Sequence, residues 1–367
     1  MPDPTTKTPA PETPALATAA LATAALATAA LATIVVTPRE RFGVAEESLR
    51  SIIELTETPY ELIYLDAGSP AQIAGRIKAA CEQHGFRYHR QDEFLTPNQA
   101  RNLGQRLVTT PYVVFIDNDV IVSKGWLHAL VECAEETGAE AVAPLTCQRL
   151  PVHSEIHQAG GEFAKDLPTF LNAAPGKWRM TDIHLLQGQN VEDVQLRRGE
   201  TQCCEFHCAL IRKATFERLG DLDENLLATK EHIDFCMTVW QSGGRVMFEP
   251  SSVVTYLFPS RARPLTKEDW PYFALRWSPV WQRKSLEHFQ RKWSMYDDPY
   301  FETRKGMLHW RHVEGIAKPF VRQIPILRRS YRAQKLGVAV VTAALDLWSA
   351  RLARKQASLA PVRSQGG

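Results

Sequence analysis

The feature that most constrains the fold of this chain is a run of apolar, β-prone residues that ends in two acids. Residues 112–116 are all apolar or aromatic and are followed directly by Asp117, Asn118 and Asp119. A continuous apolar run of this length predicts a buried strand of a parallel sheet. Carboxylates at the end of such a strand need a positive partner, and Mg²⁺ or Mn²⁺ holding a diphosphate suits them. The alternative is a solvated turn, where Asp and Asn are common.

The residues before this run alternate between strand and helix patterns. Strands are predicted at residues 34–36, 61–65 and 86–89, and helices at residues 48–55, 71–84 and 98–107. This alternation predicts an α/β fold with a doubly wound, mostly parallel sheet. Ligands of such sheets bind beyond the carboxyl ends of the strands. The polar side chains predicted at those ends are Thr37, Arg39, Asp66, Asp117 and Asp119.

The pattern becomes less regular after residue 145. Residues 153–199 are predicted to be rich in loops. The other predicted elements are helices at 126–137 and 213–219, and strands at 141–144, 208–211, 245–248 and 253–256. One further helix is predicted at residues 229–240, with Thr229 as its N-cap and an apolar stripe facing the core. Its first turn carries Glu231, His232 and Asp234, where acids also complement the helix dipole.

Composition divides the 367 residues into three parts. Residues 1–31 are Pro- and Thr-rich and then repeat Leu-Ala-Thr-Ala-Ala, which predicts a disordered or low-complexity segment. The uncharged run of residues 15–36 is long enough to span a bilayer, but it is weakly apolar and its end is needed as a strand. Residues 32–260 form the predicted α/β domain. Residues 261–367 form an aromatic-rich and then basic helical region, whose aromatic side chains either pack on the domain or stack on sugars.

Charge is distributed unevenly along the chain. Residues 301–367 carry thirteen Lys or Arg and three Asp or Glu, a net charge of +10, whereas the preceding 300 residues carry −8. A basic end on an acidic body suggests contact with an anionic membrane surface; nucleic acid is not expected as a partner. The helix predicted at residues 336–355 is expected to be too short to span a bilayer but able to lie on one. Seven cysteines without paired spacing indicate a reduced, cytoplasmic chain, peripheral at the inner face of the membrane if it contacts one.

Taken together, these segments resemble the family 2 glycosyltransferases, which are inverting enzymes with the nucleotide-sugar-binding GT-A fold. The resemblance covers roughly residues 33–256. The segments that carry it are Ile-Val-Val-Thr-Pro-Arg (34–39), Leu-Asp-Ala-Gly-Ser (65–69), Ala-Arg-Asn-Leu-Gly (100–104), Val-Phe-Ile-Asp-Asn-Asp (114–119), Ala-Leu-Ile-Arg (209–212) and Glu-His-Ile-Asp-Phe (231–235). Each segment is weak alone, whereas their order and spacing are specific.

The resemblance implies a role for each predicted site residue. Asp66 would accept a hydrogen bond from the nucleotide base, usually uracil, and Arg101 would lie near the nucleotide. Asp117 and Asp119 would be the family's D-x-D motif, which contacts ribose, diphosphate and a Mn²⁺ or Mg²⁺ ion. The full set predicted for the nucleotide is Thr37, Arg39, Asp66, Arg101, Asp117 and Asn118. The donor would be a nucleotide sugar, with UDP expected, and the acceptor a glycan, a lipid-linked or another hydroxyl.

The sequence departs from the family pattern at two positions. The family usually has Glu-Asp where this chain has Glu231-His232, and that Asp is its usual catalytic base. Imidazole can take a proton near neutral pH, so His232 is a candidate base, and Glu231 and Asp234 remain alternatives. Tyr256 stands near the place where many relatives have a histidine close to the metal, which leaves a third metal ligand open.

The resemblance implies a single displacement, in which a deprotonated acceptor hydroxyl attacks the anomeric carbon from the face opposite the diphosphate. Two other classes of function are alternatives. A nucleotidyltransferase would usually carry a glycine-rich basic loop after the first strand, which residues 37–41 lack. A non-catalytic carbohydrate-binding or scaffolding protein on the same fold is the other alternative, because His232 replaces the usual base.

Overall fold

The computed structural model describes residues 30–174, 179–260 and 263–359. The predictions made for residues 1–29, including most of the Leu-Ala-Thr-Ala-Ala repeat, lie outside the described residues. The strands of the central sheet are β1 (Ala32–Thr37), β2 (Tyr60–Ala67), β3 (Arg87–Gln91), β4 (Tyr112–Asp117), β5 (Val120–Val122), β6 (Ala141–Gln148), β7 (Glu155–Gln158), β10 (Gly199–Glu200), β11 (Cys208–Arg212) and β12 (Val246–Tyr256).

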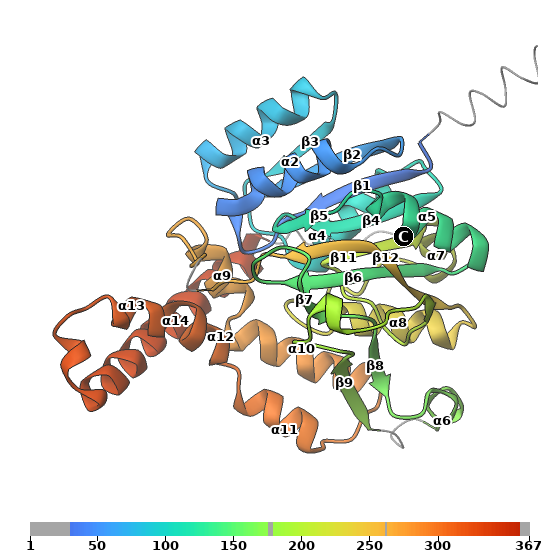
Figure 1. Cartoon of the computed structure of the whole chain (residues 1–367). Coiled ribbons are helices and arrows are strands. Elements are labelled where there is room, and N and C mark those ends of the chain that lie inside the picture. Colours follow the sequence, from blue (N-terminus) through green and yellow to red (C-terminus); the bar gives the residue numbers. More distant parts are fainter. Residues whose placement is uncertain (1–29, 175–178, 261–262, 360–367) are drawn as a thin grey trace, which may run out of the picture.

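This ten-stranded sheet forms the centre of the molecule (Figure 1). Its order is β10-β12-β6-β11-β4-β1-β2-β3, with β5 paired to β12 and β7 paired to β6. Strands β1 to β4 are parallel, as are β6 and β12. The sheet therefore confirms the predicted doubly wound, mostly parallel α/β architecture. The two segments predicted as separate strands at 245–248 and 253–256 are one strand, β12, with a register shift between Glu249 and Val253.

Helices cover both faces of the sheet because successive side chains of its strands point to opposite sides. Ile34 and Val114 pack in one core with α2 (Ala45–Leu55), α3 (Ala71–Gln83) and α5 (Trp126–Thr137). Val35 and Val113 pack in the other core with α4 (Pro97–Arg106), α7 (Lys213–Leu219) and α8 (Glu231–Gln241). This continuous apolar burial of β1 and β4 explains why both strands were recognisable in the sequence.

Strand β11 runs antiparallel to both of its neighbours, β4 and β6. Its first residue therefore lies at the same sheet edge as the last residue of β4, with Cys208 opposite Ile116. The segment between β6 and β11 was predicted to be mostly loop. It instead contains β7, a small hairpin of β8 (Gly161–Ala164) and β9 (Met180–His184), and α6 (Leu167–Asn172). These strands are four or five residues long and carry His, Glu and Asp, so they show no clear apolar period.

The C-terminal region is helical and packs against the sheet domain (Figure 1). Its main helices are α9 (Trp270–Arg276), α10 (Pro279–Lys292), α11 (Pro299–Gly306), α13 (Lys318–Arg322) and α14 (Tyr331–Leu359), with the short α12 (Trp310–His312) between α11 and α13. Most of the aromatic side chains predicted to pack or to bind sugars are core residues, including Tyr272, Phe273, Trp281 and Phe289.

The expectation that the last helix is too short to span a bilayer is wrong. The stretch Tyr331–Ser358 of α14 is long and apolar enough to cross a membrane by length and composition alone, since an 18-residue window within it has a mean hydropathy of 1.4. The helix α14 spans 29 residues, whereas the sequence predicted a helix only over residues 336–355. One side of α14 buries Leu345, Ser349 and Ala353 against the rest of the protein.

Candidate active site and metal centre

A cavity of about 670 Å³ opens beyond the carboxyl ends of β1 and β12. Arg39, two residues after β1, and Tyr256, the last residue of β12, form part of its wall. Trp277, Leu286 and Tyr300, from the C-terminal region, line it as well. The cavity lies where the alternating strand pattern predicted a ligand site.

Asp117 ends β4 and is buried next to this cavity. Its carboxylate is contacted by two arginines, a threonine and a histidine. Its Oδ1 accepts hydrogen bonds from Thr37 Oγ1 at 3.2 Å and Arg101 Nη2 at 3.3 Å. Its Oδ2 accepts from Arg39 Nη1 at 3.0 Å and lies 3.1 Å from His207 Nδ1. Burial alone would raise the pKa of Asp117, but Arg39, His207 and Arg101 outweigh it and hold the pKa well below its usual range. Asp117 is therefore a carboxylate anion.

Asp119, in the turn after β4, differs from Asp117 both in its contacts and in the direction of its pKa shift. It is 0% exposed, and neither of its carboxylate oxygens has a hydrogen-bond partner. Burial is the largest cause that raises its pKa well above the ordinary value, and the charge of Asp117 adds to it. A buried, unpartnered carboxylate is costly unless a proton or a metal ion occupies it. Ligand atoms of Asp117, Asp119 and His207 all lie within 4.8 Å of one another, so the three residues fit one divalent cation.

His207 was not identified from the sequence, yet it supplies an imidazole at the place left open by Tyr256. The rings of the two residues stack with centroids 3.9 Å apart. Burial, followed by the charge of Arg39, lowers the pKa of His207 to about 4, which leaves a neutral ring able to bind a metal. Its Nε2 lies 3.6 Å from Glu205 Oε2. A carboxylate behind a histidine is the usual second contact of a metal-binding imidazole.

The residues predicted for the nucleotide fall into two places. Thr37, Arg39, Arg101 and Asp117 form the bonded cluster described above. Asn118 holds the loop after β1 against it: Asn118 Oδ1 accepts from the backbone N–H of Arg39 at 2.9 Å, and its own N–H donates to the carbonyl of Thr37 at 3.0 Å. These two hydrogen bonds hold the loop so that the Arg39 side chain reaches Asp117.

Asp66 lies at the end of β2 and does not line the cavity. Its Oδ2 accepts hydrogen bonds from Tyr88 Oη at 2.5 Å and Arg90 Nη1 at 2.6 Å, both on β3. Its Oδ1 accepts from the backbone N–H of Ser69 at 3.2 Å. The carboxylate is thereby held in one orientation on the other side of β1 from Asp117, as the sheet order requires.

The first turn of α8 places the three candidate bases in different surroundings. The helix begins at Glu231 because Lys230 takes a left-handed conformation with φ +74°, so the prediction of Thr229 as N-cap is wrong. Glu231 Oε1 accepts from Arg276 Nη2 at 3.1 Å and lies 4.0 Å from Arg101 Nη1. Burial raises the pKa of Glu231, but these two arginines outweigh it and lower the pKa below its ordinary value. Glu231 is thus a weak base.

His232 lines the cavity, and Asp234 does not. Burial is the largest cause that lowers the pKa of His232, despite the nearby charges of Glu205 and Glu231. The ring is therefore neutral at neutral pH. Asp234 points elsewhere: its Oδ2 accepts from Lys292 Nζ and its Oδ1 from Trp293 Nε1, both at 2.8 Å. The structure thus brings Glu231 and His232 to the cavity, and Asp234 to the contact with α10.

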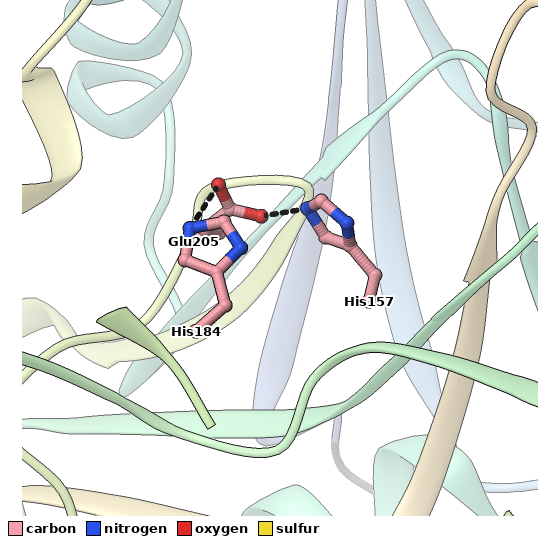
Figure 2. Close-up of side chains that lie close together, drawn as sticks. All are labelled: His157, His184 and Glu205. Carbon is pink, nitrogen blue, oxygen red and sulfur yellow. Dashed lines mark hydrogen bonds and ion pairs between the residues drawn. The ribbon is translucent and has the colours of Figure 1, made fainter. Parts of the chain in front are cut away.

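Three more cavity residues were missed by the sequence analysis. His157, His184 and Glu205 converge from β7, β9 and the loop before β11 (Figure 2). The signal that could have found them is three histidines within the segment 153–199, two of which line the cavity, together with the Glu205–His207 pair that precedes an apolar strand. Without the hairpins in view, nothing in the sequence joins these positions.

Comparison with known proteins gives relatives of moderate similarity. Polypeptide N-acetylgalactosaminyltransferase 3 of Mus musculus is 27% identical over 202 residues, which cover 53% of this chain and 31% of that protein. The hyaluronan synthase of Pasteurella multocida is 28% identical over 114 residues, covering 30% of this chain and 12% of that protein. The chain thus spans about a third or less of the length of these curated relatives.

Among solved structures, GalNAc-T7 with UDP, GalNAc and Mn²⁺ aligns with a TM-score of 0.49 and 16% identity, covering 80% of this chain and 57% of that one. The mannosyltransferase PcManGT from Pyrobaculum calidifontis, in complex with GDP-Man and Mn²⁺, aligns with a TM-score of 0.46 and 17% identity over 89% of this chain and 84% of that one. The family model described as glycosyl transferase family 2 matches residues 33–220, just over half of the chain. The resemblance found in the sequence is therefore confirmed, and the chain belongs to glycosyl transferase family 2.

Proposed function

We propose that this protein is an inverting glycosyltransferase that moves a sugar from a nucleoside diphosphate sugar, UDP being favoured, to an acceptor hydroxyl. The observation that carries the proposal is Asp119, whose two buried oxygens have no hydrogen-bond partner while Asp117 and His207 lie beside it. This arrangement leaves room for one more positive charge at the sheet edge where a diphosphate would arrive. Family membership supports the same reaction class.

Asp117, Asp119 and His207 would hold the divalent cation, and Mn²⁺ suits the mixed oxygen and imidazole set better than Mg²⁺. When bound, the cation would neutralise charge that develops on the diphosphate leaving group. Arg39 and Arg101 form ion pairs with Asp117 in the structure. We propose that their guanidinium groups also contact the diphosphate of a bound donor. The protein would otherwise act by alignment within the cavity.

We assign the proton transfer to His232. Its ring is neutral and faces the cavity. Glu231 is instead an anion paired with Arg276, and Asp234 is paired with Lys292. A neutral imidazole can take the acceptor proton as the hydroxyl attacks the anomeric carbon from the face opposite the diphosphate. The acceptor would enter between His232 and the aromatic side chains of Trp277 and Tyr300, which line the same cavity.

The proposed function is tested by a screen of UDP-, GDP- and other nucleotide sugars with and without Mn²⁺. We expect UDP-sugars to raise the thermal stability of the full chain in the presence of Mn²⁺, and Mn²⁺-dependent release of UDP to follow with one of them. Stabilisation by a free sugar alone, without any release of nucleotide, would instead favour the non-catalytic carbohydrate-binding protein.

We expect Asp66→Ala to weaken UDP binding by about ten- to a hundredfold, with or without metal. The reason is the loss of one hydrogen bond from the base to a charged acceptor, worth roughly 1.5–3 kcal/mol. Calorimetric titration with UDP measures the effect. Tyr88→Phe, which removes one support of the same carboxylate, should weaken binding less. Parental affinity in Asp66→Ala would remove Asp66 from the nucleotide site.

We further propose that α14 places the protein on an anionic membrane surface, at the cytoplasmic face. An exposed apolar stripe runs along this helix at helical spacing, formed by Leu336, Ala339, Val340, Ala343, Ala344 and Leu347. Exposed basic residues flank the stripe at both ends, namely Arg332 and Lys335 before it and Arg351, Arg354 and Lys355 after it. An apolar stripe between cationic ends suits lipids with anionic headgroups. An acceptor at such a surface would be lipid-linked.

Replacing Leu336, Val340 and Leu347 by serine should weaken binding to vesicles that contain phosphatidylglycerol by about tenfold or more. These side chains are 67%, 61% and 65% exposed, so the change removes apolar surface that lipid would bury without opening the core. Flotation of vesicles measures it, and parental binding should fall as salt screens the basic ends. Tyr296→Ser, at a 51% exposed site outside α14, is the control. Equal flotation of all three proteins would contradict a membrane role for α14.

A further inference from the structure

Glu205 is surrounded by imidazole rings on the wall of the cavity (Figure 2). His157 Nε2 lies 2.7 Å from Glu205 Oε2, and His184 Nε2 lies 3.5 Å from Glu205 Oε1. The three side chains offer ligand atoms that lie within 4.8 Å of one another. Their side chains are only 12–19% exposed, so they are held in a partly dry site that remains open to the cavity.

The hydrogen bonds around His157 fix which of its nitrogens carries a proton. Gln148 Nε2 donates to Glu155 Oε1 at 2.7 Å, because a carboxylate can only accept. The amide oxygen of Gln148 therefore faces His157 Nδ1, at 3.2 Å, and this nitrogen must be the N–H donor. In a neutral ring, His157 Nε2 is then a bare lone pair, and it faces a carboxylate oxygen of Glu205. Two acceptors at this distance repel unless a cation joins them.

The cation that joins them is either a second proton on His157 or a metal ion. Protons would join these groups as two separate contacts, one from a second proton on His157 and one from an Nε2–H of neutral His184 to Glu205 Oε1. A metal ion would use all three groups at once. Gln148 behind His157 is the kind of second contact that orients a metal-binding imidazole.

We propose that His157, His184 and Glu205 form a second metal site, suited to a first-row divalent transition metal such as Zn²⁺. Two imidazoles and one carboxylate are borderline ligands that favour Zn²⁺ and its neighbours over Mg²⁺ or Ca²⁺. Three protein ligands leave coordination positions free on the cavity side, where an oxygen of a bound molecule could enter. This site goes beyond the catalytic cation, which Asp117, Asp119 and His207 would hold.

The two sites are neighbours. Glu205 Oε2 lies 3.6 Å from His207 Nε2, and the rings of His157 and His207 have centroids 5.6 Å apart. A cation in the second site would therefore offset the negative charge of Glu205, and Glu205 is the carboxylate that also faces His207. The proposal itself does not depend on glycosyl transfer, because metal content is measured without any sugar.

The experiment counts bound Zn²⁺ in the full chain after chelator treatment, reloading and gel filtration. Asp119→Asn, which disables the catalytic site, should retain one tightly bound equivalent. The double variant Asp119→Asn/His184→Ala should bind Zn²⁺ about a hundredfold more weakly or lose it, since removing a direct ligand costs at least as much as removing an outer one. Gln148→Leu in the Asp119→Asn background should weaken Zn²⁺ by about tenfold, because it only frees the ring of His157.

His128→Ala is the matched control, because His128 lies on α5 with its side chain 69% exposed and does not line the cavity. It should leave Zn²⁺ content unchanged, and circular dichroism should show that every variant is folded. The proposal is overturned if folded Asp119→Asn binds no Zn²⁺ while nitrogen NMR shows His157 with two protons. It is equally overturned if His184→Ala loses no more metal than His128→Ala.

Discussion

Replacing Asp119 by asparagine is expected to abolish the response to Mn²⁺ and to lower turnover of the nucleotide sugar by about a thousandfold. The cation would stabilise charge on the leaving group by several kcal/mol, and roughly 4 kcal/mol corresponds to three orders of magnitude in rate. Asparagine keeps the size of the side chain but cannot supply an anionic ligand. Steady-state release of UDP over a range of Mn²⁺ concentrations measures the effect.

The same substitution should lower turnover without lowering the thermal stability of the metal-free protein. This difference separates loss of the metal from loss of the fold. Because burial raises the pKa of Asp119 in the folded protein, the metal-free parent should lose stability as the pH rises above about 4, the usual value for Asp. Asp119→Asn should lack this loss and unfold at an equal or higher temperature in chelator. Mn²⁺ should stabilise the parent but not the variant. A variant that still gains stability from Mn²⁺ would place the catalytic cation elsewhere.

His232→Ala is expected to lower turnover by about a hundredfold while UDP binding stays at the parental level, since general-base help is typically worth that much. Catalysis needs the neutral ring, and the pKa of His232 is lowered from 6.5. Turnover of the parent should therefore be lost only as the pH falls below about 6.5, when the ring takes up a proton. The pH profile of turnover at saturating substrate measures both effects.

Two variants act as controls for this assignment. His232→Asp restores the residue that the family usually has, so it should retain part of the activity and shift the acid limb to lower pH. Asp234→Asn should keep near-parental turnover, because this side chain binds Lys292 and Trp293 outside the cavity. If Asp234→Asn loses turnover and His232→Ala does not, the proton transfer belongs to Asp234 and His232 is only a residue of the cavity wall.

The part of the site that could be predicted from the sequence is the part built on parallel strands. Residues 112–116 form an uninterrupted apolar run, and such a run tells where a strand ends and therefore where its polar neighbours lie. Asp117 and Asp119 were placed correctly in the fold for this reason. Thr37 and Asp66 were found at the ends of β1 and β2 by the same argument.

The other half of the site was out of reach because its strands are too short to show a period. His157 and His184 sit on strands of four and five residues, and Glu205 and His207 precede a strand instead of following one. Looking for polar residues after the carboxyl ends of predicted parallel strands cannot find residues that precede an antiparallel strand such as β11. Similarly, Asp234 and His232 share one helical turn, and only the packing of α10 decides that one of them faces away from the cavity.

The reversed direction of β11 lets the two halves of the site change independently. Residues 32–119 build one half of the site from repeated βα units, whose side chains are tied to the register of the sheet. Residues between β6 and β11 enter the same place from outside that register, through short hairpins. Substitution or exchange of this insert can therefore change the cavity wall around His157 and His184, while the hydrogen bonds of Asp117 to Thr37 and Arg39 remain. This one contiguous stretch is accordingly an economical target for directed evolution of that wall.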